Sequence, residues 1–501
     1  MYFIIIRLGE FLRIGHTSQL QPHSTSPNDR RLELQRTADE TASTIREAAG
    51  KESTILTVTH FDADGLTAGA IAFEAVKRLN TIVHLRIVEN LSERTVEEIG
   101  AIDADFIIFS DIGSGYLDIV SKGLKNREIV IADHHQVLGE APPNLHHFNT
   151  HLMGFNGSEE ISGAGTAYLL AKAIDPRNVD LSALAIVGCL GDQQDKGPKR
   201  SLIGLNTEIL EDAVKAKLVE VTQDLVLFGR QTRPIHRAIA STTTPFLPGL
   251  SGEEDRCLAL LDSVNIPTKV DDRWRTISDL SLEEKKRLVD RIIQHMISLK
   301  LSGEVALELI GSVYTLTKEE SSTPLRDARE YGSLLNACGR MGKPGLGVAL
   351  GLGDRGASFE EAQQVYSEYR KFLSKYMNWI TSDPKSLVQK GHLVIVRGEG
   401  VIDENMTGAV SSILSSSNLF GGSKVTLVVT ATKEGESKVS ARGTDQLIEK
   451  GLNLGKILQD LSPKYGGYGG GHAIAAGATV QRQSLEPFLT QFEKTIESTI
   501  K

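Results

Sequence analysis

The stretch 54–65, TILTVTHFDADG, decides the fold of this chain. The apolar, β-like run 54–59 is followed by His60, by Asp62 and Asp64, and then by a glycine. In an open parallel sheet, the carboxyl ends of the strands lie side by side, and ligands bind there. A strand that leads into two acids therefore predicts a site at that edge of a sheet, although Asp-x-Asp-Gly also occurs as ordinary turn chemistry.

Two later apolar runs end in the same way. The run 106–110 (FIIFS) leads into Asp111, and the run 129–132 (IVIA) leads into Asp133-His134-His135. Carboxylates and imidazoles that gather from separate strand ends form a pocket for hard divalent metal ions. One acid at a strand end is common, but three in succession, with paired histidines, indicate a metal-dependent hydrolase.

Strands and helices alternate through the first part of the chain. We predict strands at 54–59, 82–88, 105–110 and 129–132, with helices at 66–79, 92–99 and 115–123 between them. This rhythm is typical of βαβ units in a parallel sheet. Further helices are predicted at 29–49 and 166–174, whereas the periodicity of 183–190 fits a helix or a strand.

A length of 501 residues is too great for one hydrophobic core and indicates several domains. A second α/β unit is predicted, with strands at 392–397, 425–430, 438–442 and 473–480 and helices at 404–415 and 485–500. Apolar residues at three- and four-residue spacing predict one long amphipathic connector helix over 359–380. The expected fold class is therefore α/β, with a parallel-sheet domain, a smaller α/β domain, a helical insertion and a connecting helix. The expected divisions are a partly disordered N-terminal extension (1–49), the first α/β domain (50–225), the insertion (226–330), the connector region (331–385) and the second domain (386–501).

The composition indicates a protein of the cytoplasm. Forty percent of the residues are hydrophobic and 24% are charged, and no apolar run is long enough to span a membrane. Three scattered cysteines show neither disulfide nor zinc spacing, which suits a reducing compartment. The net charge of −9 argues against a general nucleic-acid coat protein. With only 5% aromatic residues, any contact with a nucleic-acid strand is expected to be short and close to the metals.

Four motifs, in order, resemble those of the DHH phosphoesterases. They are HFDADG at 60–65, the lone Asp111, ADHH at 132–135 and Gly191-Asp192. The later GGGH at 469–472 resembles the signature of the DHH-associated domain. The whole set looks most like the archaeal RecJ-like single-strand nucleases, and the resemblance covers about 50–225 and 330–495.

This resemblance implies a metal site made of His60, Asp62, Asp64, Asp111, His134 and Asp192. It implies that Asp111 bridges two ions and that His135 contacts a substrate phosphate or polarises the attacking water. Alternatives stay open, because His60 could instead orient an aspartate, Asp111 could cap a turn, and paired histidines are commonly structural. Four carboxylates and one imidazole suit two Mn²⁺ or Mg²⁺ ions, which lie about 3.5–4 Å apart in such sites.

The resemblance also implies a phosphate-binding surface. Its expected residues are Asn336, Arg340, Ser440, Arg442, Gly469, Gly470, Gly471 and His472. Glycines let the backbone approach an anion, successive N–H groups can form an anion nest, and an arginine can hold a phosphate with two hydrogen bonds. These glycines are expected to form a loop, which can also be a flexible linker, and Arg340 could be a buried structural residue. His146, His147 and His151 are expected to be solvated loop residues.

The leading interpretation is an exonuclease that acts on single-stranded DNA or RNA and releases nucleoside 5′-monophosphates, with a role in DNA replication or repair. An alternative keeps the chemistry but takes very short oligonucleotides or pAp-type molecules. A third interpretation is a structural replication factor, against which the intact acidic motifs argue. The resemblance also raises the GINS complex as a partner, and no membrane partner is expected.

Overall fold

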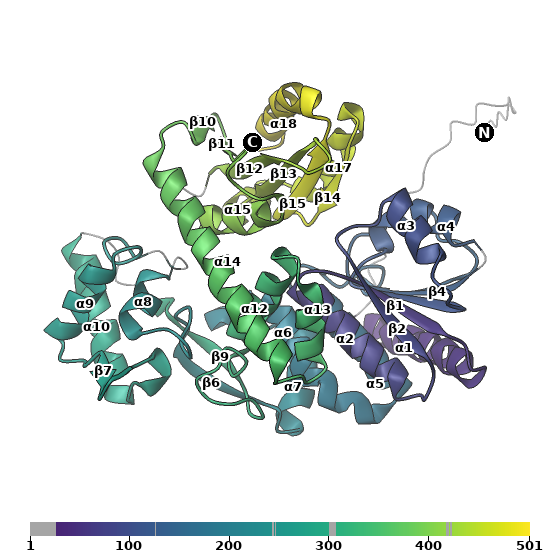
Figure 1. The fold of residues 1–501 in the computed structure, drawn as a ribbon, viewed down its shortest axis with the longest axis horizontal. Coiled ribbons are helices and arrows are strands. Elements are labelled where there is room, and N and C mark those ends of the chain that lie inside the picture. Colours follow the sequence, from purple (N-terminus) through teal and green to yellow (C-terminus); the bar gives the residue numbers. More distant parts are fainter. Residues whose placement is uncertain are drawn as a thin grey trace, which may run out of the picture.

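The computed structural model describes residues 27–125, 127–242, 245, 247–299, 307–416, 420 and 423–500. Two α/β lobes, a helical insertion and one long helix make up this part of the chain (Figure 1). The expected fold class is thereby confirmed. Most of the predicted N-terminal extension lies outside the described residues, but Pro27–Gly50 forms helix α1, which packs on the first lobe through Ala42 and Ile45. None of the described helices is both long and apolar enough to cross a bilayer.

The first lobe is built on a five-stranded parallel sheet. The strands are β1 (Ile55–His60), β2 (Val83–Val88), β3 (Phe106–Ser110), β4 (Glu128–Asp133) and β5 (Leu145–Asn149), in the order β2-β1-β3-β4-β5. Chain order reverses between β1 and β3, and such a switch point opens a crevice at the carboxyl ends of the strands. The motif residues follow β1, β3 and β4, so they gather at this crevice.

Both faces of the sheet are covered, which explains why its central strands are apolar throughout. On one face, Ile107 and Phe109 pack with helices α3 (Glu93–Gly100) and α4 (Leu117–Gly123). On the other face, Phe106 and Ile108 pack with α1 and with α2 (Ala63–Lys77), α5 (Gly163–Ile174) and α6 (Ser182–Gly191). The segment 183–190 is therefore helical, and α7 (Leu205–Lys215) packs beside it.

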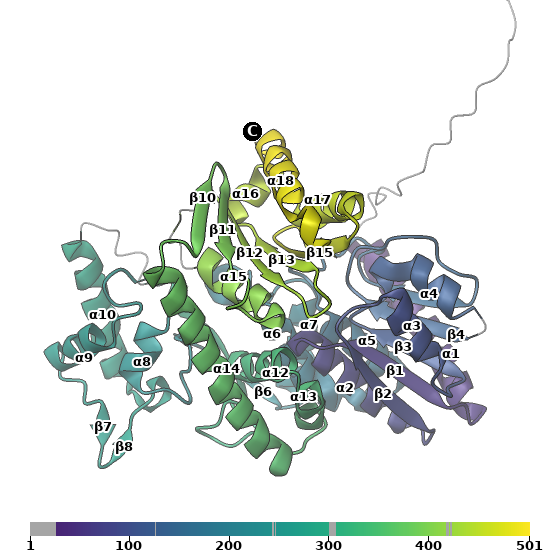
Figure 2. The same ribbon diagram turned by 45° about the horizontal axis from the view of Figure 1, so that its top comes forward.

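The insertion has a hydrophobic core of its own. Strands β6 (Val219–Leu225) and β9 (Ile310–Leu316) pair antiparallel at its base. Between them lie α8 (Ile235–Ala240), α9 (Glu254–Ser263), the short hairpin β7–β8 (Lys269–Val270 and Arg273–Trp274) and α10 (Leu282–Ser298). These helices form a separate body beside the connector helix (Figure 2).

The connector region consists of three helices: α12 (Ala328–Arg340), α13 (Pro344–Gly351) and α14 (Ala357–Ser382). Helix α14 is the predicted amphipathic helix. It runs from the α12–α13 pair up to the second lobe (Figure 1), and its Tyr366 and Tyr369 are buried against the first core. Helix α12 packs against α6 and α2, so its residues lie close to two of the acidic motifs.

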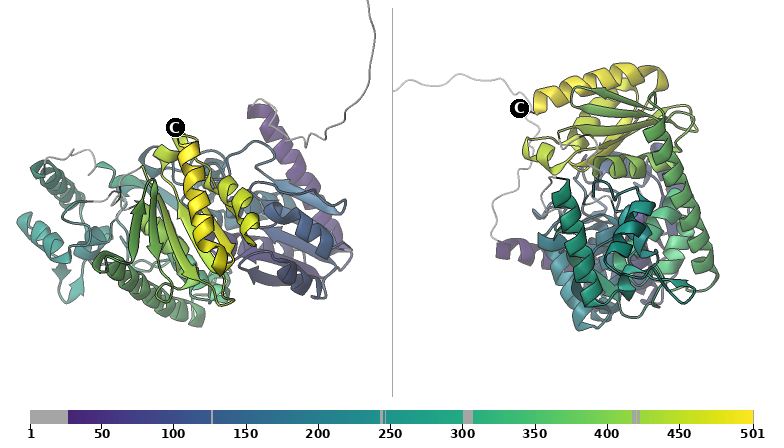
Figure 3. Two further views of the ribbon diagram at one scale, coloured as in Figure 1. Left: turned by 90° about the horizontal axis from the view of Figure 1, so that it is seen from above. Right: turned by 90° about the vertical axis from the view of Figure 1, so that its left-hand side faces the viewer.

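The second lobe is a mixed six-stranded sheet. Its strands are β10 (Leu387–Lys390), β11 (Leu393–Arg397), β12 (Val425–Ala431), β13 (Ser437–Arg442), β14 (Tyr468–Gly471) and β15 (Ala475–Val480), in the order β10-β11-β12-β13-β15-β14. Only β11 and β12 are parallel. Its helices are α15 (Thr407–Ser416), α16 (Asp445–Glu449), α17 (Leu454–Leu461) and α18 (Leu485–Thr499). Figure 3 shows this sheet next to the first lobe, with α18 on its outer side.

The structure corrects three expectations about elements. Residues 145–149, including His146 and His147, form β5 and not a solvated loop. Their strand is fixed by its pairing with β4 and by burial of Phe148. Helix α2 starts at Ala63, so Asp64 lies in its first turn and not before it. The glycines 469–471 belong to the edge strand β14, because they pair with β15.

Candidate metal centre

Asp62 is held at the end of β1 by two contacts. Its Oδ1 accepts a hydrogen bond of 3.0 Å from the Gly65 N–H, which caps α2, and its Oδ2 lies 3.1 Å from Nδ1 of His60. Burial raises the pKa of Asp62, but the His60 imidazole and the Gly65 N–H outweigh burial and hold this pKa far below its usual range. Asp62 is therefore a carboxylate anion, and His60 is its immediate partner.

Asp64 connects two helices. Its carboxylate is buried and accepts hydrogen bonds from the N–H groups of Gly163 (2.7 Å) and Ala164 (2.9 Å), at the start of α5. A negative charge is favourable at a helix N-terminus. Burial nevertheless raises the pKa of Asp64. Anchored in this way, the carboxylate lies 3.7 Å from Nε2 of His134.

Asp111 follows β3 in a left-handed backbone conformation, with φ of 58°. Aspartate tolerates this conformation better than most residues. Its buried Oδ1 lies 3.1 Å from Nε2 of His134 but accepts no hydrogen bond of good geometry from any described residue. Gly163 leaves the room for this carboxylate, because an added Cβ there would lie 2.1 Å from Oδ1 of Asp111.

The hydrogen bonds of His134 define its tautomer. Its Nδ1 lies 2.7 Å from the carbonyl oxygen of Gly157 and 3.1 Å from that of Ile161, so Nδ1 carries the proton. In the neutral imidazole, Nε2 then carries no proton. Its lone pair faces the lone pairs of the Asp111 carboxylate. Two facing acceptors need a positive charge between them, either a proton or a metal ion. Backbone carbonyls behind Nδ1 are the usual support of a metal-bound histidine.

Asp192 completes this group at the carboxyl end of α6. Its Oδ2 accepts a hydrogen bond of 2.8 Å from Nε2 of Gln194. Burial, and then the charge of Asp64, raise its pKa to about 7. Burial and the same neighbour also raise the pKa of Asp111. Carboxylates that raise one another's pKa in a buried cluster fit a site for divalent cations, which cancel this repulsion.

Among the described residues, the possible ligand atoms fall into four overlapping sets, two of which could each hold one ion. Possible ligand atoms of Asp64, His134 and Asp192 lie within 4.8 Å of one another, and so do those of His60, Asp62 and Asp111. Because Asp111 also belongs to a third set with Asp133, His134 and His135, it lies between the two groups. Oxygen ligands with one or two imidazoles suit Mn²⁺ or Mg²⁺, and two such sets around one aspartate fit a pair of ions.

Asp133 was missed as a site residue in the sequence interpretation, although it belongs to the ADHH motif. It is completely buried, and its Oδ1 lies 2.7 Å from Nδ1 of His135 and accepts the N–H of His134 at 2.8 Å. Its Oδ2 accepts the N–H of Ser114 at 3.1 Å. Burial raises the pKa of Asp133, but the nearby His135 holds it far below its usual range. Asp133 therefore orients His135 and leaves the other nitrogen of that ring facing outward.

His472 brings the second lobe to this centre. Its ring stacks on His135, with ring centroids 4.9 Å apart, and its Nδ1 lies 3.1 Å from Oγ of Ser158. Burial, and then the neighbouring His135, lower the pKa of His472 well below its usual value. A neutral imidazole from the second lobe thus covers one side of the metal centre.

The glycines before His472 form an edge strand, so the predicted irregular loop is wrong. Gly469 and Gly470 pair with Ala478 and Gly477 of β15. Only Gly471 has a positive φ (132°), and an added Cβ there would lie 2.7 Å from the carbonyl oxygen of Ala475. This glycine makes the turn that aims His472 at the first lobe, whereas a phosphate contact by the glycines stays a prediction.

Two arginines converge, one from the connector region and one from the second lobe. Arg340, at the end of α12, donates to the carbonyl oxygen of Asn405 (3.2 Å), and Arg442, on β13, donates to Oγ of Ser412 (2.9 Å). Both guanidinium groups lie next to Gly408. Burial, and then the charge of Arg340, lower the pKa of Arg442 to about 10. Two half-buried cations beside the same glycine are suited to an anion.

Asn336 and Ser440 use their polar atoms within the protein. Asn336 accepts the N–H of Ala63 at 3.0 Å and donates to the carbonyl oxygen of Gly191 at 3.3 Å, so it joins the ends of two motif helices. Ser440 is buried and lies 2.9 Å from Oγ1 of Thr407. The substrate contacts predicted for Asn336 and Ser440 therefore stay predictions. Their hydrogen bonds within the protein are more simply interpreted as structural support.

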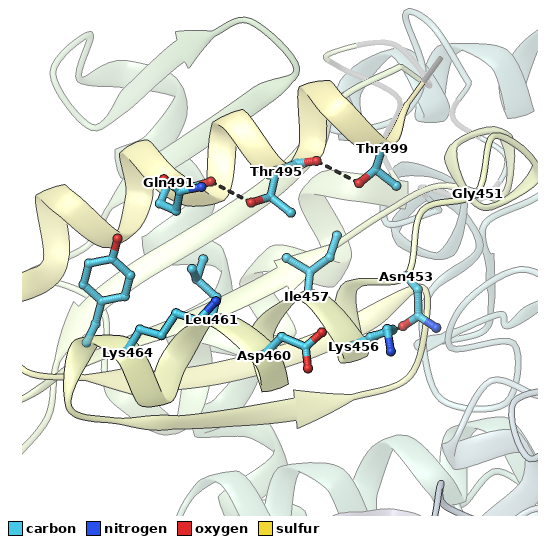
Figure 4. A pocket seen from close by; sticks show the side chains of 11 residues that line it. Gly451, Asn453, Lys456, Ile457, Asp460, Leu461, Lys464, Gln491, Thr495 and Thr499 are labelled. Carbon is cyan, nitrogen blue, oxygen red and sulfur yellow. Dashed lines mark hydrogen bonds between the residues drawn. The ribbon is translucent and has the colours of Figure 1, made fainter. Parts of the chain in front are cut away.

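A cavity of about 600 Å³ lies elsewhere, between α17 and α18 (Figure 4). Lys456, Lys464 and Thr495 are among the described residues that line it. Its lining contains none of the predicted site residues. The predicted site residues therefore lie away from this cavity.

Comparisons with known proteins agree with this architecture. The family model of the DHH-CID domain matches residues 227–310, which form the insertion, and the DHHA1 domain model matches 391–498. An uncharacterized protein of Methanocaldococcus jannaschii is 31% identical over 449 residues, which cover 88% of this chain and 93% of that protein.

Solved structures share the fold at low sequence identity. RecJ of Thermus thermophilus in complex with Mn²⁺ has a TM-score of 0.55 and 18% identity, over 92% of this chain and 55% of that chain. The chain thus spans about half the length of that RecJ. CDC45 of Entamoeba histolytica has a TM-score of 0.61 and 12% identity, over 92% and 99%. The chain belongs to the DHH superfamily, and its fold is RecJ-like.

Proposed function

We propose that the protein is a two-metal phosphodiesterase that degrades single-stranded DNA or RNA from an end and releases nucleoside 5′-monophosphates. The observation that carries this proposal is the pair of facing acceptors at the centre of the site. Nε2 of His134 and Oδ1 of Asp111 are 3.1 Å apart, with Asp64 and Asp192 around them. This donor set is built for cations, and a cation pair beside bound phosphate is typical of phosphodiester hydrolysis.

Divalent cations at such a site neutralise charge on the phosphate and lower the pKa of the attacking water. His60, Asp62 and Asp111 would hold one ion, and Asp64, His134 and Asp192 the other, with Asp111 shared between them. The backbone contacts of Asp62, Asp64 and His134 keep these ligands in place before any ion arrives, so little reorganisation opposes binding.

His135 is the proposed residue for proton handling. Asp133 accepts its Nδ1–H at 2.7 Å, and the side chain is 34% exposed. A carboxylate behind one nitrogen of an exposed imidazole is the arrangement of a general base or of a donor to phosphate.

The second lobe is proposed to hold the nucleic-acid strand. Arg442 and Arg340 supply the charge for a phosphate next to the cleaved bond, and charge-assisted hydrogen bonds to phosphate are among the stronger polar contacts in proteins. His472 closes the crevice from the same side. Since the chain as a whole carries a net charge of −9, these local cations are the proposed source of affinity.

Two solved RecJ structures support the choice of metal and of an exonuclease reaction. The Thermus thermophilus RecJ contains Mn²⁺, and a second structure with a TM-score of 0.50 and 18% identity is an exonuclease RecJ bound to manganese. On this basis we propose Mn²⁺ or Mg²⁺ as the cofactor, while the single strand as substrate and a role in DNA replication or repair are proposed from the motif resemblance. Very short oligonucleotides or pAp-type molecules are the alternative substrates.

A second candidate function is a role as a component of a replication complex. It is favoured by the likeness to CDC45, which covers nearly the whole of that chain, and by the DHH-CID insertion. Binding to the GINS complex would belong to this role. The two roles are compatible in one molecule, but the intact cation site favours an enzyme.

The test is digestion of 5′-labelled and 3′-labelled DNA and RNA oligonucleotides with Mn²⁺, in which the first product is resolved. The expected result is a mononucleotide from one end only, from single strands and not from duplexes. Asp111→Ala serves as the control for contaminating nucleases. Release of inorganic phosphate alone would favour the phosphatase alternative, and no hydrolysis at all would favour the purely structural role.

A further inference from the structure

Gln194 is a fully buried polar side chain two residues beyond Asp192. Its Nε2 lies 2.8 Å from Oδ2 of Asp192, 2.8 Å from the carbonyl oxygen of Gly157 and 3.1 Å from that of Ile161. All three neighbours are acceptors, and the two N–H groups of the amide face them. Burying a glutamine costs free energy unless its polar atoms are paired, and here they are fully used.

The orientation of this amide is fixed from behind. Oε1 of Gln194 accepts a hydrogen bond of 2.6 Å from Nδ2 of Asn206, and Oδ1 of Asn206 in turn accepts the Cys189 thiol at 3.0 Å. Rotating the Gln194 amide by 180° would turn its oxygen toward three acceptors and its nitrogen toward a donor. The network therefore allows one orientation only.

The same two carbonyl groups also hold His134. The oxygens of Gly157 and Ile161 lie 2.7 and 3.1 Å from Nδ1 of His134. One amide and one imidazole thus share two acceptors, and the amide also holds the carboxylate of Asp192. Through these shared contacts, Gln194 determines where two side chains of the same proposed metal set point their remaining lone pairs.

We propose that Gln194 is a positioning residue of the metal centre, which presents Oδ1 of Asp192 and Nε2 of His134 toward one cation. This inference rests on the proposed function, because it assumes that the Asp64, His134 and Asp192 set binds a metal. Supporting hydrogen bonds of this kind typically change metal affinity by about ten- to a hundredfold when they are removed.

The test replaces Gln194 by methionine, which has a similar length and volume but no donors. Mn²⁺ affinity is measured by titration calorimetry without nucleic acid, so the readout does not depend on catalysis. We expect the dissociation constant of one Mn²⁺ per chain to rise by about ten- to a hundredfold, with an unchanged circular dichroism spectrum. The matched control is Gln193→Met, the same substitution at the exposed neighbouring residue, which should keep the affinity of the unaltered protein.

A Gln194→Met protein with unchanged Mn²⁺ affinity would overturn the inference and leave the proposed function intact. An equal loss in Gln193→Met would also overturn it, because the effect would then belong to the segment and not to the amide. If Gln194→Met does not fold, Asn206→Ala keeps the amide but releases its orientation. Asn206→Ala should lose less Mn²⁺ affinity than is expected for Gln194→Met, at the same ion. Unchanged affinity in Asn206→Ala would count against the inference. Absence of Mn²⁺ binding in the unaltered protein would instead refute the proposed function.

Discussion

Replacing Asp192 by asparagine is expected to stabilise the metal-free protein. The same change should reduce the further stabilisation that Mn²⁺ gives. The carboxyl group of Asp192 is surrounded by acids, and burial together with Asp64 raises its pKa from 3.8 to about 7. The folded protein therefore binds more protons than the unfolded chain between these two pH values. Its stability falls as the pH rises through this window, and asparagine, which does not titrate, removes that loss.

The size of the effect follows from the same values. Each pH unit between the two pKa values corresponds to about 1.4 kcal/mol, so the difference from 3.8 to about 7 corresponds to on the order of 4 kcal/mol at pH 8. The gain in unfolding free energy should shrink as the pH falls below 7 and vanish near pH 4. An amide also keeps an oxygen acceptor for Nε2 of Gln194, which lies 2.8 Å from Oδ2.

Urea unfolding in EDTA at pH 5 and pH 8, for both proteins, measures this gain. A matched control is Asp195→Asn, three residues along the chain. Asp195 lies 2.8 Å from Nη2 of Arg329 and 2.9 Å from Nε of Arg200, and although burial raises its pKa, these cations lower it overall. Removing its charge should destabilise the protein at pH 8 by on the order of 3 kcal/mol, because two partly buried cations lose their partner.

In the presence of Mn²⁺, the two variants should differ in how much the ion stabilises them. The Asp195→Asn protein keeps every proposed ligand and should still be stabilised by the ion, whereas Asp192→Asn should gain much less than the unaltered protein. A ligand at a concentration of a hundred times its dissociation constant adds about 2.7 kcal/mol to the free energy of unfolding. If Asp192→Asn is less stable than the unaltered protein in EDTA at pH 8, or has the same pH dependence, the electrostatic reasoning about this cluster is refuted.

Three further predictions concern activity. Arg442→Ala should weaken oligonucleotide binding by about ten- to a hundredfold at low salt, and less at high salt because one phosphate contact fewer lowers the salt dependence, while Mn²⁺ affinity by calorimetry stays unchanged; loss of metal with normal oligonucleotide binding would reverse the roles of the lobes. EDTA should abolish hydrolysis of labelled oligonucleotides, and Mn²⁺ should restore it better than Ca²⁺, so full activity in chelator would exclude this chemistry. Asp111→Ala should reduce turnover by several orders of magnitude with an unchanged circular dichroism spectrum, and a folded variant with a tenth of the activity would contradict the shared-ligand role of Asp111.

The acidic motifs could be read from the sequence because each is tied to a local pattern. An apolar run of five or six residues followed by an acid is a short-range signal, and parallel pairing then brings β1, β3 and β4 together automatically. The sequence thus predicted the crevice and its acids. The stacking of His472 on His135 places the end of β4 next to the second lobe.

Elements that depend on partners distant in sequence were not predictable. The strand β5 carries two histidines and is stabilised by pairing with β4, while His147 lies 2.9 Å from Oγ of Ser114. Glycines are depleted in strands, so 469–471 suggested a loop, yet pairing with β15 overrides that preference.

Side-chain direction was the other limit. The sequence placed Ser440 and Arg442 on one face of β13 but could not indicate that Ser440 is buried against Thr407. Asp133 was not predicted as a site residue, because the two histidines that follow it are the more usual ligands. Only the turn geometry shows its contact with His135. Gln194 carries no sequence signal, because its role depends on two carbonyl groups that lie 37 and 33 residues earlier in the chain.

Anomalous diffraction from crystals soaked in Mn²⁺ tests the central claim most directly. The account predicts two peaks about 3.5–4 Å apart. One should lie among Asp64, His134 and Asp192, the other among His60 and Asp62, with Asp111 touching both. Peaks at other places, or none at the crevice at millimolar Mn²⁺, would contradict the assignment of this cluster as a two-metal phosphodiesterase centre.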